Sequence, residues 1–255
     1  MEEPVKKFRK DLLEVEIFAT RDAMGRGAAA EAAQWLRKRL SEKESVRAVF
    51  AAAPSQNEFL AALCAAPGID WKRVHALHMD EYVGLPEGAP QTFGSFLRNA
   101  IFDRVPFGSV EYIGSEGTPE ALCARYDEIL RRKKVDVVFM GIGENGHIAF
   151  NDPHVAFFDD PVLIKKVDLD WKCRMQQVHD GCFPTIEAVP KYALTLTIPA
   201  MTVADRIFCV VPAPSKADAV YSTLTGPVSE TCPASILRRH PAATLYLDAD
   251  SAAKL

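Results

Sequence analysis

A glycine-rich segment near the middle of the chain holds the residue types of an acid–base site. After an apolar run over residues 135–140, the chain reads Gly141-Ile-Gly-Glu-Asn-Gly-His-Ile-Ala-Phe-Asn-Asp-Pro153. Glycines at the end of a strand let the backbone approach a ligand closely, and Gly143 is placed for such a contact. His147 can transfer protons near neutral pH, and Asn145 and Asp152 are close enough in sequence to orient its imidazole. We therefore predict an acid–base site at this turn.

A second candidate group is Asp80, which ends the apolar run over residues 74–79. Aspartate is also common in turns and helix caps, where it has no chemical role. The neighbouring carboxylate of Glu81 points to the opposite side if the chain is still extended there. Only one of the two can then face a pocket at the strand end, and we expect Asp80 to face it and to act as a general base.

Two strand-to-helix junctions and one arginine could hold an anion. Ser55 and Gln56 follow one apolar run, and Lys216 follows another. Amides at a helix N-terminus and a lysine ammonium both suit phosphate, although Ser55 could equally be a plain helix cap. Arg174 is a weaker candidate for a bidentate phosphate contact. We predict that these residues bind an anionic group of the substrate.

Three other chemistries have less support. The glycines of the turn match the dinucleotide-binding pattern, but Pro153 disfavours the helix that this pattern requires after its last glycine. No cluster of histidine and carboxylate residues has the spacing of metal ligands. The chain also lacks the Gly-x-Ser-x-Gly elbow of many serine hydrolases. We therefore expect neither a nucleotide nor a metal at the site.

The elements that must position these groups alternate between strand-like and helix-like patterns. Strands are predicted over residues 15–20, 46–52, 74–79, 135–140, 193–198, 206–211 and 243–248, and helices over 21–43, 57–66, 92–102, 119–133, 215–224 and 233–239. This alternation predicts an α/β fold with a mostly parallel sheet covered on both faces. No repeat or linker divides the chain, so we expect one domain over residues 1–255. Ligands of such folds bind beyond the carboxyl ends of the strands, where all the polar segments above fall.

Charge and cysteine usage narrow the partners and the compartment. A formal net charge of -4 gives no indication of nucleic acid or of an anionic membrane surface. The N-terminal residues lack the apolar core of a signal peptide, and no apolar run is long enough to span a bilayer. The six cysteines form no paired or zinc-like pattern, and Cys64, Cys123 and Cys209 lie among apolar neighbours. Reduced, buried thiols favour a cytoplasmic protein.

These residues together resemble the glucosamine-6-phosphate deaminase/isomerase family, a relative of the 6-phosphogluconolactonases. The segment Met79-Asp-Glu-Tyr-Val-Gly-Leu85 resembles the first signature of the family, and the glycine-rich turn resembles the second. The likeness covers nearly the whole chain. It implies a Rossmann-like three-layer sandwich without a nucleotide, and neither an organic cofactor nor a metal.

The resemblance also implies a reaction and the residues that perform it. Asp80 would move a proton between sugar C2 and C1. His147 would help to open the pyranose ring, with Asn145 and Asp152 as its partners, and Lys216 would contact the phosphate. The implied enzyme is an isomerase/deaminase of the hydrolase class in amino-sugar metabolism. It converts an amino-sugar phosphate of the glucosamine 6-phosphate type to a keto-sugar phosphate and ammonia. A homo-oligomer is compatible with the resemblance, since relatives occur as monomers and as oligomers.

Three positions depart from the family pattern. The phosphate loop is roughly Gly-x-x-Thr-Gly-x-Thr-Pro in the family but reads Ala51-Ala-Ala-Pro-Ser-Gln-Asn57 here. The ring-opening carboxylate is usually glutamate, whereas this chain has Asp152. The arginine expected before a Phe-Phe pair is missing near residues 179–183, where Arg174 could replace it. Two alternatives follow: a lactonase that uses His147 to activate water without a base at Asp80, and a non-catalytic sugar-phosphate sensor.

Overall fold

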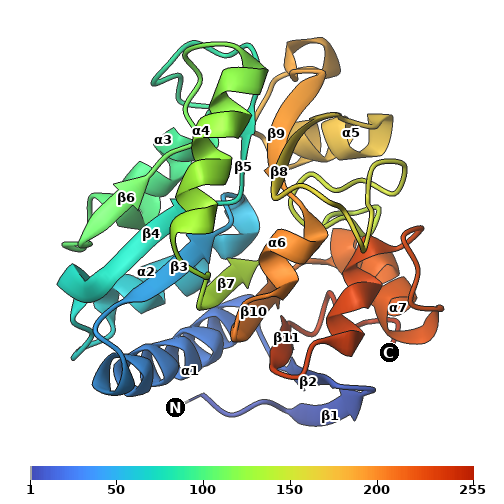
Figure 1. The fold of residues 1–255 in the computed structure, drawn as a ribbon. Coiled ribbons are helices and arrows are strands. Elements are labelled where there is room, and N and C mark those ends of the chain that lie inside the picture. Colours follow the sequence, from blue (N-terminus) through green and yellow to red (C-terminus); the bar gives the residue numbers. More distant parts are fainter. Residues whose placement is uncertain (1) are drawn as a thin grey trace.

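A predominantly parallel sheet of eight strands runs through the computed structural model, which describes residues 2–255 (Figure 1). Seven strands pair in parallel, and only the edge strand β1 is antiparallel to its neighbour. In spatial order the strands are β1 (Lys6–Lys10), β2 (Leu13–Ile17), β11 (Ala243–Leu247), β10 (Arg206–Val211), β7 (Val137–Met140), β3 (Val46–Phe50), β4 (Val74–His78) and β6 (Ser109–Glu111). The α/β class predicted from the alternating pattern is confirmed.

Seven α-helices of the described chain connect and cover the strands. They are α1 (Arg21–Glu42), α2 (Asn57–Ala65), α3 (Phe93–Leu97), α4 (Pro119–Arg132), α5 (Trp171–His179), α6 (Ile198–Thr202) and α7 (Ala217–Thr225). Their starts follow ordinary capping rules, because the side chains of Thr20, Thr118 and Asp170 accept backbone N–H groups in the first turns of α1, α4 and α5. Caps of this kind fix where α1, α4 and α5 begin.

The two faces of the sheet bury two separate cores, because successive residues of a strand point to opposite sides. In β7, Val137 and Phe139 belong to the core formed with α1 and α2. Val138 and Met140 belong to the core formed with α4, α6 and α7. Burial on both faces explains the nearly continuous apolar runs of the central strands, and it produces the expected three layers.

Two of the predicted strands differ in the structure, because part of the chain forms a second sheet. β5 (Asp80–Tyr82), β9 (Tyr192–Leu196) and β8 (Ile164–Asp168) form a three-stranded antiparallel sheet beside α5 (Figure 1). The predicted strand over residues 193–198 therefore lies outside the parallel sheet. It ends at Leu196 because Thr197 caps α6 and Pro199 occupies the first turn of that helix. The strand predicted over residues 74–79 ends at His78, and the chain then leaves the central sheet.

Several smaller elements also differ from prediction. The helix expected over residues 92–102 begins as α3 and continues as a π-helical turn over Arg98–Phe102, and residues Pro233–Arg239 form a 3-10 helix. The pattern gave no sign of β1, β6, β8, α5 or α6. The short strands are edge elements with few buried residues, and α5 carries polar residues on its buried face, so neither shows clear hydrophobic periodicity.

The strand order places a topological switch point between β3 and β7. From β3 the chain proceeds to β4 and β6 on one side, and from β7 it proceeds to β10 and β11 on the other. The two strands are direct neighbours, with Phe50 opposite Phe139. Connections that leave neighbouring strands in opposite directions open a crevice at their carboxyl ends. The crevice therefore lies between the loop after β3 and the glycine-rich turn after β7.

Within the part of the chain that the structure describes, all six cysteines are free. Cys209 is buried as expected, but Cys64 and Cys123 are only partly buried, because they lie on the outer helices α2 and α4 and not in the sheet. No helix over residues 2–255 combines the length and the apolar character needed to cross a membrane.

Candidate active site

A small polar pocket occupies the switch point. Six of the nine predicted site residues line it: Ser55, Gln56, Asp80, Gly143, His147 and Lys216. Its cavity is about 60 Å³, which is room for a few water molecules. An adjoining cavity of about 250 Å³ shares the lining residues Ala52, Ala53, Phe93 and Gln177 with it. Asp80 and His147 both border the first of these two cavities.

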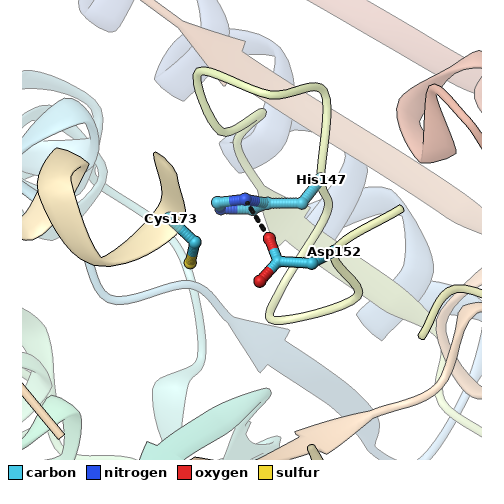
Figure 2. A group of neighbouring side chains, drawn as sticks. All are labelled: His147, Asp152 and Cys173. Carbon is cyan, nitrogen blue, oxygen red and sulfur yellow. Dashed lines mark ion pairs between the residues drawn. The ribbon is translucent and has the colours of Figure 1, made fainter. Parts of the chain in front are cut away.

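His147, which borders the pocket, pairs with the buried carboxylate of Asp152 (Figure 2). The Nδ1 atom of the imidazole lies 3.0 Å from Oδ1 of Asp152. The angle between them is poor, so Nδ1 has no well-aligned hydrogen bond; such bonds are often loose before substrate binds. Nδ1 faces the carboxylate. Nε2 is therefore the imidazole nitrogen that could exchange a proton with a ligand. Asp152 itself is fully buried and does not line the pocket, so it can act only through His147.

Gly143 has a reason for being glycine that the sequence did not reveal. A Cβ atom at this position would come within 2.1 Å of Cε1 and Nε2 of His147. The imidazole therefore packs directly against the backbone of the turn, and any larger residue would displace it. The N–H of Gly143 also donates to the carbonyl of His147, at 2.8 Å. Gly143 lines the pocket, and its bare backbone fixes the place of the histidine ring.

The turn itself is held by polar contacts between neighbours in sequence. The side-chain oxygen of Asn145 accepts the N–H of His147 at 3.1 Å, and its Nδ2 donates to Asp152 and to Asp170, each at 2.9 Å. Gly146 adopts φ 86° and Ala149 adopts φ 50°, the left-handed region that glycine enters freely and alanine only under strain. Asn145 thus orients both members of the pair without lining the pocket.

The surroundings of Asp152 keep it ionised. Burial by itself would raise the pKa of this carboxyl, but contacts from His147, the amide of Asn145 and the N–H of Asp170 together hold it below the ordinary value. The N–H of Asp170 donates to Oδ2 at 3.1 Å. A carboxylate held in this state can stabilise the positive charge that an imidazole carries after it takes up a proton.

Cys173 completes a three-residue group that the sequence spacing did not reveal (Figure 2). Its sulfur, an imidazole nitrogen of His147 and a carboxylate oxygen of Asp152 lie within 4.8 Å of one another, and all three residues are buried. One nitrogen, one oxygen and one sulfur are a donor set that transition metals accept. Burial raises the pKa of the Cys173 thiol well above its usual range, which keeps the sulfur protonated and makes it a poor ligand.

Asp80 enters the pocket from the second sheet. It is 6% exposed, and its backbone pairs with Thr195 of β9. Burial, and then the negative charge of Glu81, raise the pKa of its carboxyl well above the usual value. Glu81 points away and accepts the N–H groups of Phe93 and Gly94 at 3.0 and 2.9 Å. The two adjacent carboxylates therefore face different surroundings, one a pocket and the other the start of α3.

The remaining predicted residues divide into two groups. Ser55, Gln56 and Lys216 lie at matching 3-10 turns, Pro54–Gln56 before α2 and Pro214–Lys216 before α7, and all three border the pocket. Arg174 does not border it. Its guanidinium donates to the carbonyls of Ile186 and Val189 at 2.5 and 3.0 Å, which ties α5 to the following loop.

Two polar side chains of the pocket, Gln176 and Gln177, were not predicted from the sequence. They share the buried face of α5 with Cys173, at positions i, i+3 and i+4. Arg174 is one residue away from this face, so the helix turns its side chain elsewhere. Recognising residues 171–179 as a helix would have separated the two glutamines from Arg174.

Comparisons of the sequence and of the structure with known proteins point to the same family. Residues 19–246 match the family model described as glucosamine-6-phosphate isomerases/6-phosphogluconolactonase. A glucosamine-6-phosphate deaminase of Listeria monocytogenes is 35% identical over 202 residues, which cover 79% of this chain and 84% of that protein. A solved monomeric glucosamine-6-phosphate deaminase superposes with a TM-score of 0.84 at 27% identity, covering 94% of this chain and 98% of that one. A 6-phosphogluconolactonase of Thermotoga maritima shares the fold, with a TM-score of 0.74 at 19% identity over 92% of this chain and 99% of that one.

Proposed function

Because this chain belongs to the family of glucosamine-6-phosphate isomerases and 6-phosphogluconolactonases, we propose that it deaminates an amino-sugar phosphate of the glucosamine 6-phosphate type. The products are a keto-sugar phosphate and ammonia. One observation carries the proposal. Asp80, in β5 of the second sheet, and His147, in the turn after β7, border the same pocket. The deaminase activity of the Listeria relative supports the same choice within the family.

In the first step of this proposal, His147 opens the sugar ring. Its Nε2 takes the proton of the anomeric hydroxyl and returns a proton to the ring oxygen, which breaks the bond between C1 and that oxygen. The positive charge that the imidazole carries in between is stabilised by Asp152, 3.0 Å from Nδ1. Asp152 is therefore a positioning residue here, because it contacts His147 and lies outside the pocket lining.

In the second step Asp80 carries a proton from C2 to C1. Removal of the C2 proton by Asp80, with transfer of one proton from the ammonium group of the substrate to the C1 oxygen, gives an enolamine. Return of the proton from Asp80 to C1 then gives a protonated ketimine. Water then adds to the C=N bond, and ammonia leaves as the C2 carbonyl forms. The net reaction consumes one water, and in this sense we assign the reaction to the hydrolase class. A carboxyl whose pKa is raised by burial is a stronger base once it is ionised.

The proposal is tested by incubating the purified protein with glucosamine 6-phosphate and with galactosamine 6-phosphate. Ammonia and the corresponding keto-sugar phosphate are measured separately, each against time. We expect both products in equal amounts from at least one substrate. If neither substrate yields ammonia, the deaminase assignment is wrong for this chain. Thermal stabilisation by the sugar phosphates without any product would instead support the non-catalytic sensor.

The buried His147–Asp152 pair also suits activation of water, which is the lactonase alternative. Asp80→Asn separates the two enzymes. A deaminase should lose roughly 10²- to 10⁴-fold in kcat because the carbon-to-carbon proton transfer loses its base. A lactonase should keep most of its activity towards a 6-phosphogluconolactone. The assay is therefore run with both substrates on the wild type and on the variant.

Two further properties stay predictions. We propose a cytoplasmic location, supported by the free cysteines of the described chain. A homo-oligomer also stays a prediction; light scattering of the eluted protein would decide between it and a monomer. A small-molecule sugar phosphate is the proposed partner, and neither nucleic acid nor a membrane is expected.

A further inference from the structure

Asp80 and His147 reach the pocket from elements that are far apart in the sequence. Asp80 belongs to β5 of the second sheet, whereas His147 belongs to the turn that follows β7 of the central sheet. The two groups act on one sugar in the proposed reaction, so their separation must be held closely. A misplacement of about 1 Å at a reacting group can cost roughly 10²-fold in rate. Some part of the molecule must therefore join the two elements.

Strand β9 holds the backbone at Asp80. Asp80 lies opposite Thr195 in the antiparallel pair of β5 and β9. The N–H of Leu196 donates to the carbonyl of Met79, the residue before Asp80, at 2.8 Å. Because the bonds of an antiparallel ladder fix the register of both strands, the position of Asp80 follows that of Thr195 and Leu196.

The same two residues of β9 also hold the glycine-rich turn. The N–H of Phe150 donates to Oγ1 of Thr195 at 3.1 Å. The hydroxyl hydrogen of Thr195 is directed to the carbonyl of Leu196, at 3.1 Å, which leaves the hydroxyl oxygen to accept. The side-chain amide of Asn151 donates to the same carbonyl of Leu196 at 2.8 Å and to the carbonyl of Ile148 at 3.0 Å. Two neighbouring residues of β9 therefore contact both elements of the site.

These contacts lie away from solvent and from the pocket. Thr195 and Asn151 are 0% exposed, and neither is among the residues that border the pocket. Water therefore does not compete for their hydrogen bonds, and neither side chain touches a substrate there. Ala149, one residue before Phe150, has a φ of 50° and borders the pocket. A strained residue of this kind persists only where its surroundings hold it, and the bonds from Phe150 and Asn151 to β9 do so.

We propose that Thr195 and Asn151 are positioning residues, which set the separation of Asp80 and His147 by forming a bridge between the turn and β9. The proposal rests on the proposed function and adds residues that act only through the two catalytic groups. The hydroxyl of Thr195 is the central contact, because its oxygen bonds the turn while the backbone of the same residue pairs with Asp80. A residue that only supported folding would change the amount of folded protein and not the turnover of each folded molecule.

Thr195→Val tests the central contact. Valine keeps the branched shape but lacks the oxygen that accepts the N–H of Phe150. With turnover expressed per folded molecule, we expect kcat for glucosamine 6-phosphate to fall roughly 10- to 100-fold while KM changes much less, because the displaced groups act in the transition state. Thr195→Ser keeps the oxygen and should recover most of the loss. An equal loss in Thr195→Ser, or no loss in Thr195→Val, would overturn the role of this oxygen.

Thr244→Val is the matched control. Thr244 is also 0% exposed, and its hydroxyl accepts a bond from Arg206 at 2.8 Å. It lies in β11 of the central sheet and does not border the pocket. We expect its melting temperature to fall and its kcat per folded molecule to stay within about twofold of the wild type. A loss of turnover as large as that of Thr195→Val would mean that any buried hydroxyl has this effect, and would overturn the proposal.

Asn151→Leu tests the second contact of the bridge. Leucine is similar in size to asparagine but donates to neither of the two carbonyls. We expect kcat per folded molecule to fall roughly 10-fold, for the same reason as in Thr195→Val. An unchanged kcat would overturn the role of Asn151. The Thr195 variants decide the bridge by themselves if leucine at this buried position prevents folding.

A double-variant cycle separates positioning from stability. Thr195→Val is measured in the wild-type background and in the Asp80→Asn background. In the second background we expect a further loss of kcat of less than about twofold, because the base that Thr195 positions has already been removed. The same factor in both backgrounds would mean that Thr195 acts independently of Asp80, and would overturn its positioning role.

Amide hydrogen exchange tests the bridge without any substrate. Exchange of the Phe150 N–H is measured in the wild type, Thr195→Val, Thr195→Ser and Thr244→Val. We expect it to be roughly 10-fold faster in Thr195→Val and unchanged in the other two variants, since only valine removes its acceptor. Unchanged exchange in Thr195→Val would overturn the bridge. Failure of the wild type to release ammonia, with this exchange pattern intact, would overturn only the proposed reaction.

Discussion

Two histidine–aspartate pairs of this protein have the same separation and very different surroundings. His147 and Asp152 are 3.0 Å apart, with side chains 8% and 0% exposed. His154 and Asp168 are also 3.0 Å apart, with side chains 41% and 62% exposed. Water competes for the second pair and screens it, whereas the first pair has only protein partners. Burial and the supporting hydrogen bonds, and not the distance, make the first pair suited to catalysis.

We expect the largest difference between the two pairs in kcat, measured after each aspartate is replaced. Asp152→Asn removes the charge that stabilises the protonated imidazole, and we expect kcat to fall by about 10²-fold or more while KM changes little. Asp168→Asn removes the matched exposed charge and should leave both constants within twofold. Steady-state ammonia release measures both variants. A similar loss in the two variants would mean that burial does not distinguish the pairs.

The same two substitutions should also differ in their effect on the free energy of unfolding, although by a smaller amount. An amide at position 152 would place an NH₂ group against the N–H of Asp170 or the amide of Asn145, which leaves a buried donor without an acceptor. We expect about 1–3 kcal/mol of lost unfolding free energy. The exposed Asp168→Asn should stay within about 0.5 kcal/mol of the wild type. Urea denaturation of the three proteins at one pH gives both numbers, and a destabilised Asp168→Asn would count against the comparison.

Asp80 sharpens the comparison further, because it is also buried but lacks a positive partner. Its folded-state pKa is raised, so its contribution to stability is present below the ordinary value of 3.8 and is lost as pH rises through the raised one. Asp152 has a lowered pKa and behaves oppositely, losing its contribution as pH falls. We expect Asp80→Asn to gain unfolding free energy relative to the wild type as pH rises from 3.8 to the raised pKa, and to keep that gain above it. Unfolding measured across pH checks this, and a difference that does not change between 3.8 and the raised pKa would contradict it.

The acid–base turn and the rest of the pocket differ in how far the sequence predicted them. His147, Asn145 and Asp152 lie within eight positions of one another, so the geometry of a single tight turn brings them together. Ser55 and Lys216 come from two turns that precede helices, and Gln176 comes from the middle of α5, so their meeting depends on the order of strands in the sheet. Arg174 and Gln176 also show that a shift of two residues on a helix decides whether a side chain borders the pocket.

The sequence by itself determined the alternation of buried strands and capped helices, the family, and the local turn that carries the histidine. These depend on contacts between near neighbours and on apolar patterns that repeat along the chain. Only the tertiary structure decided that the chain leaves the central sheet after His78, that Asp152 contacts His147 from outside the pocket, and that glutamines and not an arginine border the pocket. Each of those outcomes depends on long-range packing, in which one residue's orientation is set by a backbone group far away in the sequence.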